Sequence, residues 1–253
     1  MRHSLRSVAP SLRLLAIGTL AATAILSCSD SSDDGSSDQG PRSSSAAEIR
    51  FRELEQRLLN AETVLIRGAA GSSGAVVSGL EGETTLASGN RAHLQFSGVF
   101  GGADVTPALV ADGEQMWGGN GSDQFESEVP AALNDGILLG FTRMGMLHNL
   151  ALLSSASPPD GTDGTIADWV TVSNFAWGDS ETLDGVDTDT LTFDVSVHGT
   201  PAASAVLWLD RERGLPVQRE QVVHFPDGDM RAVEVYQTVE IDPLVESDKF
   251  VVP

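Results

Sequence analysis

One segment of the chain, residues 129–155, stands apart in its pattern of apolar and polar positions. Its apolar side chains recur every three or four residues, as they do along a helix, and they are so numerous that they surround most of it. Gly145 lies inside the segment and predicts a break into two helices. A helix that is apolar on nearly all sides must be covered on most of them, by the rest of the fold or by something that the protein binds.

A further helix is predicted near the start of the folded part of the chain. Ser45 and Glu48 have the spacing of a capping box, in which each side chain bonds to the backbone N–H of the other residue. Apolar residues then follow helical spacing to about Asn60, so this helix has one face to bury. The residues on that face are Ile49, Phe51, Leu54, Leu58 and Leu59.

On both sides of the apolar segment, apolar and polar positions alternate in short runs separated by turn-forming residues. This pattern is typical of antiparallel strands with one apolar face. About ten such strands usually curl or close unless something covers their apolar side, and the helices are the obvious cover. The runs before the segment span 63–67, 75–87, 91–100, 108–111 and 115–117, with loops predicted at 68–74 and 118–128. Those after it span 169–177, 188–198, 203–210, 215–225 and 230–241.

The first residues of the chain have the regions of an export signal. Three arginines precede the uncharged run 14–26, which is shorter than the roughly 20 apolar residues that span a membrane. Small and aliphatic residues then lead to Cys28, which resembles the lipobox of bacterial lipoproteins. We therefore expect residues 1–27 to be a lipoprotein signal peptide and Cys28 to carry acyl chains such as palmitate that anchor the protein to a membrane. The alternative is an ordinary secretory signal followed by a coincidental cysteine.

A polar stretch follows the cysteine. From Ser29 to Ser45 it has no aliphatic or aromatic side chain, so folding it would not repay the entropy of ordering it. We predict that residues 28–45 form a disordered acidic tether and that residues 46–253 form the folded domain. Ser29 beside Cys28 resembles lipoproteins that are sorted outward in bacteria with two membranes. The expected place is therefore the cell envelope, at the periplasmic face of the outer membrane rather than at the inner membrane.

The chain is strongly acidic, with 36 Asp and Glu against 15 Lys and Arg and a formal net charge of −21. This charge repels nucleic acid, so we expect no nucleic-acid partner. Cys28 is the single cysteine, which excludes an intrachain disulfide and leaves no thiol for a metal site or a nucleophile in the folded domain.

No pattern of catalytic residues is present, so we expect neither an enzyme nor a cofactor. The sequence Gly71-Ser72-Ser73-Gly74 lacks the spacing of a nucleophile elbow. The acidic turn that contains Asp184, Asp187 and Asp189 is explained more simply by turn formation than by calcium. The histidines of the domain are far apart and lack the spacing of metal ligands, although His148 falls on the apolar segment. They are His93, His148, His198 and His224.

Three stretches of the sequence resemble the superfamily of periplasmic lipoprotein carriers (LolA and LolB, with the LppX-like lipoproteins). Residues 110–117 resemble a hairpin in which a strand ending in Asp-Gly leads to an aromatic residue. Residues 207–216, followed by Arg219, resemble a late hairpin of the form hydrophobic-Trp-hydrophobic-Asp and then Gly-Leu-Pro. The third stretch is 239–252, where Asp-Pro precedes Phe250.

The resemblance implies an α+β fold that is mainly antiparallel β, an unclosed half-barrel of about ten strands wrapped around a few helices. It also implies an apolar cavity that takes acyl chains. In the soluble carrier of this superfamily, an arginine of the sheet helps to hold the helical lid closed. Arg91 and Arg143 are considered for this role in the present chain, although neither aligns with the carrier's arginine. The candidate cavity residues are Leu133, Ile137, Leu138, Phe141, Met144 and Leu147 on the lid, and Trp117, Trp177 and Trp208 on the wall. For each of them the alternative is plain core packing.

Two functions are therefore considered. The first is a lipid-anchored envelope protein that binds a hydrophobic ligand in the half-barrel, namely an acyl chain, a lipid or the lipid moiety of a lipoprotein, and catalyses no reaction. The second is a protein-interaction module, such as an envelope-stress sensor, since negative regulators of extracytoplasmic sigma factors have the same fold. An enzyme ranks last because no group of residues supports it.

Overall fold

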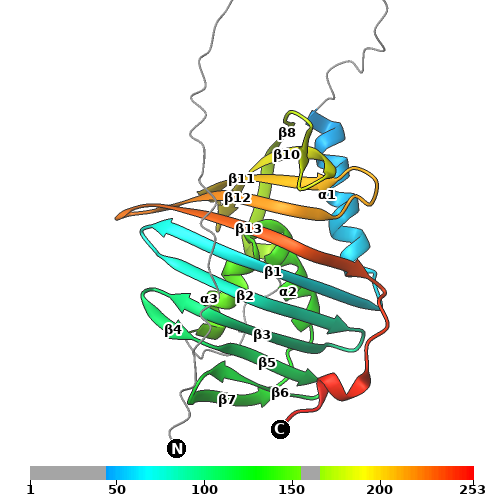
Figure 1. Cartoon of the computed structure of the whole chain (residues 1–253), viewed down its shortest axis with the longest axis vertical. Helices are drawn as coiled ribbons and strands as arrows, with labels where there is room; N and C mark the ends of the chain where they lie inside the picture. The colour runs from blue at the N-terminus through cyan, green and yellow to red at the C-terminus, as the bar shows by residue number, and fades with distance from the viewer. Residues whose placement is uncertain (1–43, 155–165) are drawn as a thin grey trace, which may run out of the picture. The chain divides into compact units, whose positions relative to one another are not determined.

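The computed structural model describes residues 44–154 and 166–253 (Figure 1). The predicted signal peptide and Cys28 lie outside the described residues, and so does the predicted tether up to residue 43. Among the helices of the described ranges, none is both long and apolar enough to span a membrane.

The described strands belong to one antiparallel sheet of 13 strands. Its order is β7-β6-β5-β3-β2-β1-β13-β12-β11-β10-β8, with β4 beside β3 and β9 beside β10. In chain order the strands are β1 (Thr63–Gly74), β2 (Ser78–Ala87), β3 (Arg91–Phe100), β4 (Ala103–Val105), β5 (Pro107–Asp112), β6 (Gln115–Asn120), β7 (Asp123–Glu128), β8 (Val170–Trp177), β9 (Glu181–Leu183), β10 (Val186–Val197), β11 (Thr200–Asp210), β12 (Pro216–Phe225) and β13 (Gly228–Ile241).

The sheet consists of two meanders that are joined by the first and the last strand. β1 pairs with β13 along its length, from Val64 opposite Ile241 to Gly74 opposite Met230. Within each meander, neighbouring strands are close in the sequence. The pairing of β1 with β13 therefore places the first and last strands at the centre of the sheet and leaves β7 and β8 at its edges.

The helices are α1 (Ser44–Leu59), α2 (Leu133–Met144), α3 (Met146–Ser154), α4 (Ile166–Trp169) and the 3₁₀ helix η1 (Ser247–Phe250). Figure 1 shows α2 and α3 together behind the central strands. α1 packs against α2 and β8, and α3 packs against β3, β5 and β6. We call the face of the sheet toward these helices the inner face and the opposite face the outer face.

Burial along the strands follows these two faces. On β3 the inner residue Leu94 is buried and its neighbour Gln95 is exposed on the outer face, as strand alternation requires. On α1 the ring of Phe51 meets Phe175 of β8 and Phe193 of β10, with centroids 5.2 and 4.9 Å apart. The core thus lies between the inner face and the helices. Of the face predicted for α1, only Ile49 departs clearly, since it is 58% exposed.

The predicted fold class is confirmed. The chain folds as a mainly antiparallel α+β protein whose sheet is unclosed and carries a few helices. The sheet has 13 strands rather than about ten because the short strands β4, β7 and β9 lack a long alternating pattern. The break at Gly145 and the Asp-Gly hairpin are also confirmed. In that hairpin, Asp112 Oδ1 accepts the backbone N–H groups of Glu114 and Gln115, both at 2.8 Å.

Two predicted loops are in fact strand. The glycine-rich stretch 68–74 is the second half of β1, where pairing with β2 on one side and β13 on the other satisfies the backbone groups despite weak strand propensity. The polar stretch 118–128 contains the end of β6 and all of β7. β7 is an edge strand with exposed and half-buried side chains, so it needs no apolar alternation.

Candidate functional site

The two halves of the apolar segment, α2 and α3, lie on the inner face. All six helix residues predicted to border a cavity pack into or against the hydrophobic core; Met144 is half-buried and the other five are buried. Phe141 shows how, since its ring meets the ring of Tyr236 on β13 edge-on at 5.1 Å between centroids. The helices therefore cover the inner face with their own side chains. The five buried residues are Leu133, Ile137, Leu138, Phe141 and Leu147.

The three tryptophans predicted for the wall do not lie together. Trp177, at the end of β8, is half-buried against the core. Trp208 alternates with the core residues Leu207 and Leu209, so it lies on the outer face, where its indole N–H donates to Glu181. Trp117 also lies on the outer face, in a groove described below. Trp117 and Trp208 are therefore separated from the helix residues by the sheet itself.

A buried polar group that the sequence analysis did not predict lies beneath the junction of α2 and α3. Arg219 on β12 is 1% exposed, and its guanidinium donates to the backbone carbonyls of Thr142 at 2.8 Å and Arg143 at 2.7 Å. It also donates to Gln221 Oε1 at 2.9 Å. The last carbonyls of a helix have no partner within the helix and form the negative end of its dipole. Arg219 thus neutralises the end of α2, although burial lowers the pKa of Arg219.

The start of α3 is held by the opposite charge. Glu234 on β13 is 2% exposed, and its carboxylate accepts the backbone N–H groups of Met146 at 2.8 Å and Leu147 at 2.9 Å. The hydroxyl of Tyr236 donates to the same carboxylate. Burial raises the pKa of Tyr236 well above its usual value, and the neighbouring carboxylate raises it further. A carboxylate at free N–H groups is stabilised by the positive end of a helix dipole.

Gly145 connects the two helices and lies so close to the Glu234 carboxylate that a side chain would not fit there. Its φ is +90°, and a Cβ added there would come within 2.6 Å of Glu234 Oε1. Arg219 and Glu234 are register partners on β12 and β13. The two charges therefore stand side by side and hold the two sides of one helix junction. We call Arg219, Glu234 and Gly145 the junction clamp.

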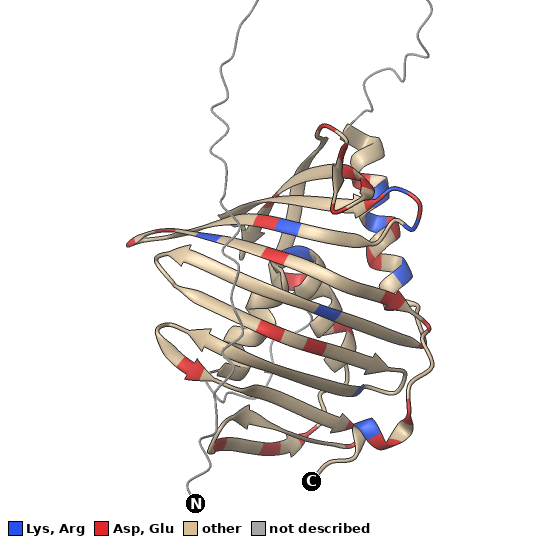
Figure 2. Ribbon diagram, viewed as in Figure 1, with Lys and Arg blue, Asp and Glu red and all other residues tan. Residues whose placement is uncertain are grey.

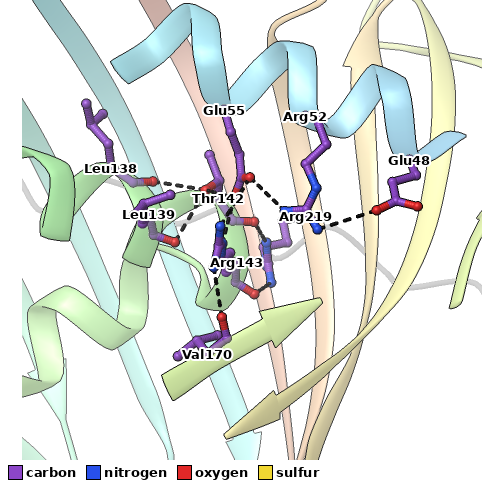
Figure 3. Close-up of polar contacts among 9 residues, drawn as sticks. All are labelled: Glu48, Arg52, Glu55, Leu138, Leu139, Thr142, Arg143, Val170 and Arg219. Atoms are coloured by element: carbon purple, nitrogen blue, oxygen red, sulfur yellow. Dashed lines mark hydrogen bonds and ion pairs between the residues drawn. The ribbon is translucent and has the colours of Figure 1, made fainter. Parts of the chain in front are cut away.

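A buried ion pair joins α2 to α1 (Figure 3). Arg143 Nε lies 2.7 Å from Glu55 Oε1, and Arg143 Nη1 donates to the carbonyl of Val170 at 2.8 Å. The hydroxyl of Thr142 also donates to Glu55. Arg143 therefore fixes α2 to α1 and β8. Arg91, the other arginine considered as a latch, lies over the ring of Phe250 instead, at 5.2 Å from its centroid.

The sequence does contain a signal for the clamp. Arg219 and Gln221 of β12 are buried on the inner face. A strand that covers a core normally has apolar side chains at these alternate positions. On β13, Glu234 shares its face with Ala232 and Tyr236 in the same way. Charged residues are rarely fully buried unless they are paired, so a charge in an apolar register points to a buried partner.

Two of the histidines considered in the sequence lie against the same tryptophan. His148 on α3 and His198, which follows β10, both lie against Trp169, with ring centroids 6.2 and 5.8 Å from it. Burial lowers the pKa of His148. In the acidic turn, Asp187 accepts the hydroxyl of Thr182 at 2.8 Å. Within the described residues, no group of three or more His, Cys, Asp and Glu could hold a metal ion.

No family model and no curated protein matches the sequence. Solved structures do match. The lipoprotein LppX of Mycobacterium tuberculosis is 13% identical over 79% of this chain and 100% of LppX, with a TM-score of 0.41. LprF of Mycobacterium bovis is 12% identical over 81% of this chain and 97% of LprF, with a TM-score of 0.46. LppX belongs to the group of lipoproteins that the sequence resemblance named.

MucB is a further similar structure. It is 15% identical over 85% of this chain and 65% of MucB, with a TM-score of 0.43. MucB of Pseudomonas aeruginosa has also been solved in complex with MucA. This chain spans about two thirds of the length of MucB, and the likeness to all three structures concerns the fold.

Proposed function

We propose that this protein is a lipid-anchored protein of the cell envelope that binds an acyl chain, of a lipid or of a lipoprotein, between its helices and the inner face of its sheet. It catalyses no reaction. The observation that supports the proposal is the way in which α2 and α3 are attached to the sheet. Their surface toward the sheet is apolar, and the junction clamp is a polar attachment at the point where they meet.

This arrangement suits a cover that can move. Apolar contacts between α2–α3 and the sheet have no fixed direction, so an acyl chain can replace them at little net cost, gaining about 0.8 kcal/mol for each CH₂ that it buries. The clamp contacts are directional and have to be kept or broken as a unit. The ligand would then lie along the inner face beside Phe141 and Leu147, with α2 and α3 displaced toward the solvent.

The proposed place in the cell rests on the N-terminal sequence. The lipobox-like residues before Cys28 and the polar stretch after it support a lipid anchor followed by a flexible tether. Ser29 supports sorting to the outer membrane. A domain on such a tether would reach acyl chains at the membrane surface or on lipoproteins in the periplasm.

The proposal is tested by photocrosslinking. Benzoyl-phenylalanine is placed at Phe141, on the inner side of α2, or at Phe225, which is 42% exposed at the end of β12. The full-length protein is incubated with radiolabelled palmitate and irradiated, and extracted lipid is identified by mass spectrometry. We expect label at position 141 and none at 225. Protein that carries no lipid after purification and takes no label at 141 would rule the proposal out.

A second candidate function is binding of an envelope protein by strand addition. β7 pairs with β6, and no other strand of the described residues pairs with it. Its exposed side chains include Asp123, Glu126 and Glu128, so an extended basic segment of a partner fits this edge. Affinity capture from an envelope extract tests it. One stoichiometric protein that is lost when Gln124 is replaced by proline, with no bound lipid, would favour this function over the first.

A further inference from the structure

The outer face of the sheet carries a groove that neither proposed function uses. It has a volume of about 610 Å³, within the range of roughly 300–1,000 Å³ that is usual for small-molecule sites. Five side chains define it, and we call it the outer groove. They are Arg67 on β1, Glu83 on β2, Gln95 on β3, Trp117 on β6 and Gln237 on β13.

The register of the strands explains why the surface is hollow there. Arg67, Glu83 and Gln95 stand opposite one another on β1, β2 and β3. The same row continues through Ala108 on β5 and Gly119 on β6, which have little or no side chain. The surface therefore falls after Gln95, and Trp117 forms a wall two residues along β6 from Gly119.

The other end of the groove is shaped by a bulge in β13. The register shifts between Arg67 and Gly68 of β1, and Gln237 of β13 is the extra residue, without a register partner. Gln237 is exposed beside Arg67, and both line the groove. Neither Gln95 nor Gln237 forms a side-chain hydrogen bond within the described part of the chain. Two planar amides, each with a donor and an acceptor group, are thus available to a ligand.

The charges beside the groove form one ion cluster. Glu83 is held between Arg67, whose Nε lies 2.8 Å from Oε2, and Lys249 of η1, whose Nζ lies 2.5 Å from Oε1. Of the charged residues that line the groove, Arg67 is basic and Glu81 and Glu83 are acidic. Figure 2 shows the basic residue on β1 beside the acidic residues on β2. The groove therefore has no excess of positive charge that would select an anionic ligand.

An indole, two free amides and an ion cluster without excess positive charge together limit the class of ligand that fits the groove. An acyl chain would leave the amides without hydrogen bonds, and the net charge of −21 repels nucleic acid. A sugar ring has an apolar C–H face that packs on an indole and hydroxyl groups that both donate and accept hydrogen bonds. We propose that the outer groove binds a neutral oligosaccharide. One sugar ring stacks on Trp117, and hydroxyl groups of the oligosaccharide form hydrogen bonds with Gln95, Gln237 and the Arg67–Glu83 pair.

Tryptophan fluorescence and titration calorimetry test the proposal. The full-length protein, in a zwitterionic detergent without a sugar headgroup, is titrated with chitotetraose, cellotetraose and maltotetraose. We expect saturable binding of at least one of them. Trp117→Ala should weaken it by about fivefold or more, because stacking on an aromatic ring is worth roughly 1 kcal/mol. Gln95→Ala and Gln237→Ala should each weaken it several-fold.

Gln218→Ala is the matched control, since Gln218 lies on β12 outside the groove, and it should leave binding unchanged. Circular dichroism melting shows that each variant is folded. Palmitate labelling at position 141 should be the same in Trp117→Ala, because the two sites lie on opposite faces of the sheet. Absence of saturable binding for all three sugars, or equal affinity in Trp117→Ala and the unaltered protein, would overturn the proposal while leaving the lipid-binding function untouched.

Discussion

Arg219 and Glu234 stand opposite each other on β12 and β13, and between them they hold the end of one helix and the start of the next. Each charge faces the helix end of opposite sign, so the pair serves both the sheet and the helix junction. Both residues are nearly inaccessible to solvent, which makes their contacts strong and the loss of either partner costly. The clamp therefore links the stability of the domain to the position of its apolar helices.

Replacing Arg219 by methionine should destabilise the domain by about 3–5 kcal/mol. The buried charge of Glu234 would lose the guanidinium beside it, and the carbonyls of Thr142 and Arg143 would lose their hydrogen-bond donor. Urea unfolding measures the change in the free energy of unfolding. Arg231→Met, on the exposed side of β13, is the control and should change it by less than about 0.5 kcal/mol. Equal effects of the two substitutions would contradict the role given to the clamp.

Replacing Gly145 by alanine should cost about 2–5 kcal/mol, the sum of left-handed backbone strain and the displacement of Glu234 from two N–H groups. Gly185→Ala separates the two causes. Gly185 has a similar φ of +86°, but a Cβ there meets nothing within 4 Å. This control should cost only the strain, about 1–2 kcal/mol. If thermal unfolding shows the same loss for both, the contact between Gly145 and Glu234 contributes nothing.

Stability should fall as the pH drops below about 6.5, in part because of His148. Burial lowers the pKa of His148 in the folded protein from its usual value of 6.5, so the unfolded chain binds the proton more readily. The contribution is fully present above pH 6.5 and is lost as the pH falls toward the folded pKa. His148→Gln should flatten the dependence of the unfolding free energy on pH between 7 and 5. His224→Gln, at an exposed pair with Asp229, is the comparison; an unchanged slope in His148→Gln would contradict the assignment.

Cys28→Ala should abolish acylation and release the protein from the membrane fraction, since Cys28 is the single cysteine and would carry the acyl chains. Metabolic labelling with an alkyne analogue of palmitate, followed by fractionation of the envelope, measures both effects. Label that persists in the variant would show that the lipid is attached elsewhere. A variant that stays in the membrane without label would show that the anchor is not acyl.

The local pattern of residues was enough to predict much of the fold. Strand β3 was predicted with its observed bounds, because alternation over ten residues has a single physical interpretation. The helix break at Gly145 and the turn after Asp112 were equally local, since backbone freedom at glycine and the short reach of an aspartate side chain act within a few residues. The acidic charge and the predicted export signal are likewise properties of composition and order.

Only the tertiary structure determined which neighbours each strand has and which of its faces is covered. The glycine-rich second half of β1 is a strand because β2 and β13 lie on either side of it, and β13 is far away in the sequence. The same long-range pairing sets Arg219 beside Glu234 and turns Trp117 and Trp208 to the outer face, away from the helices that they were predicted to border. An alternating pattern of apolar and polar residues indicates that a strand has two different faces. Which of these faces is covered depends on contacts between distant parts of the chain.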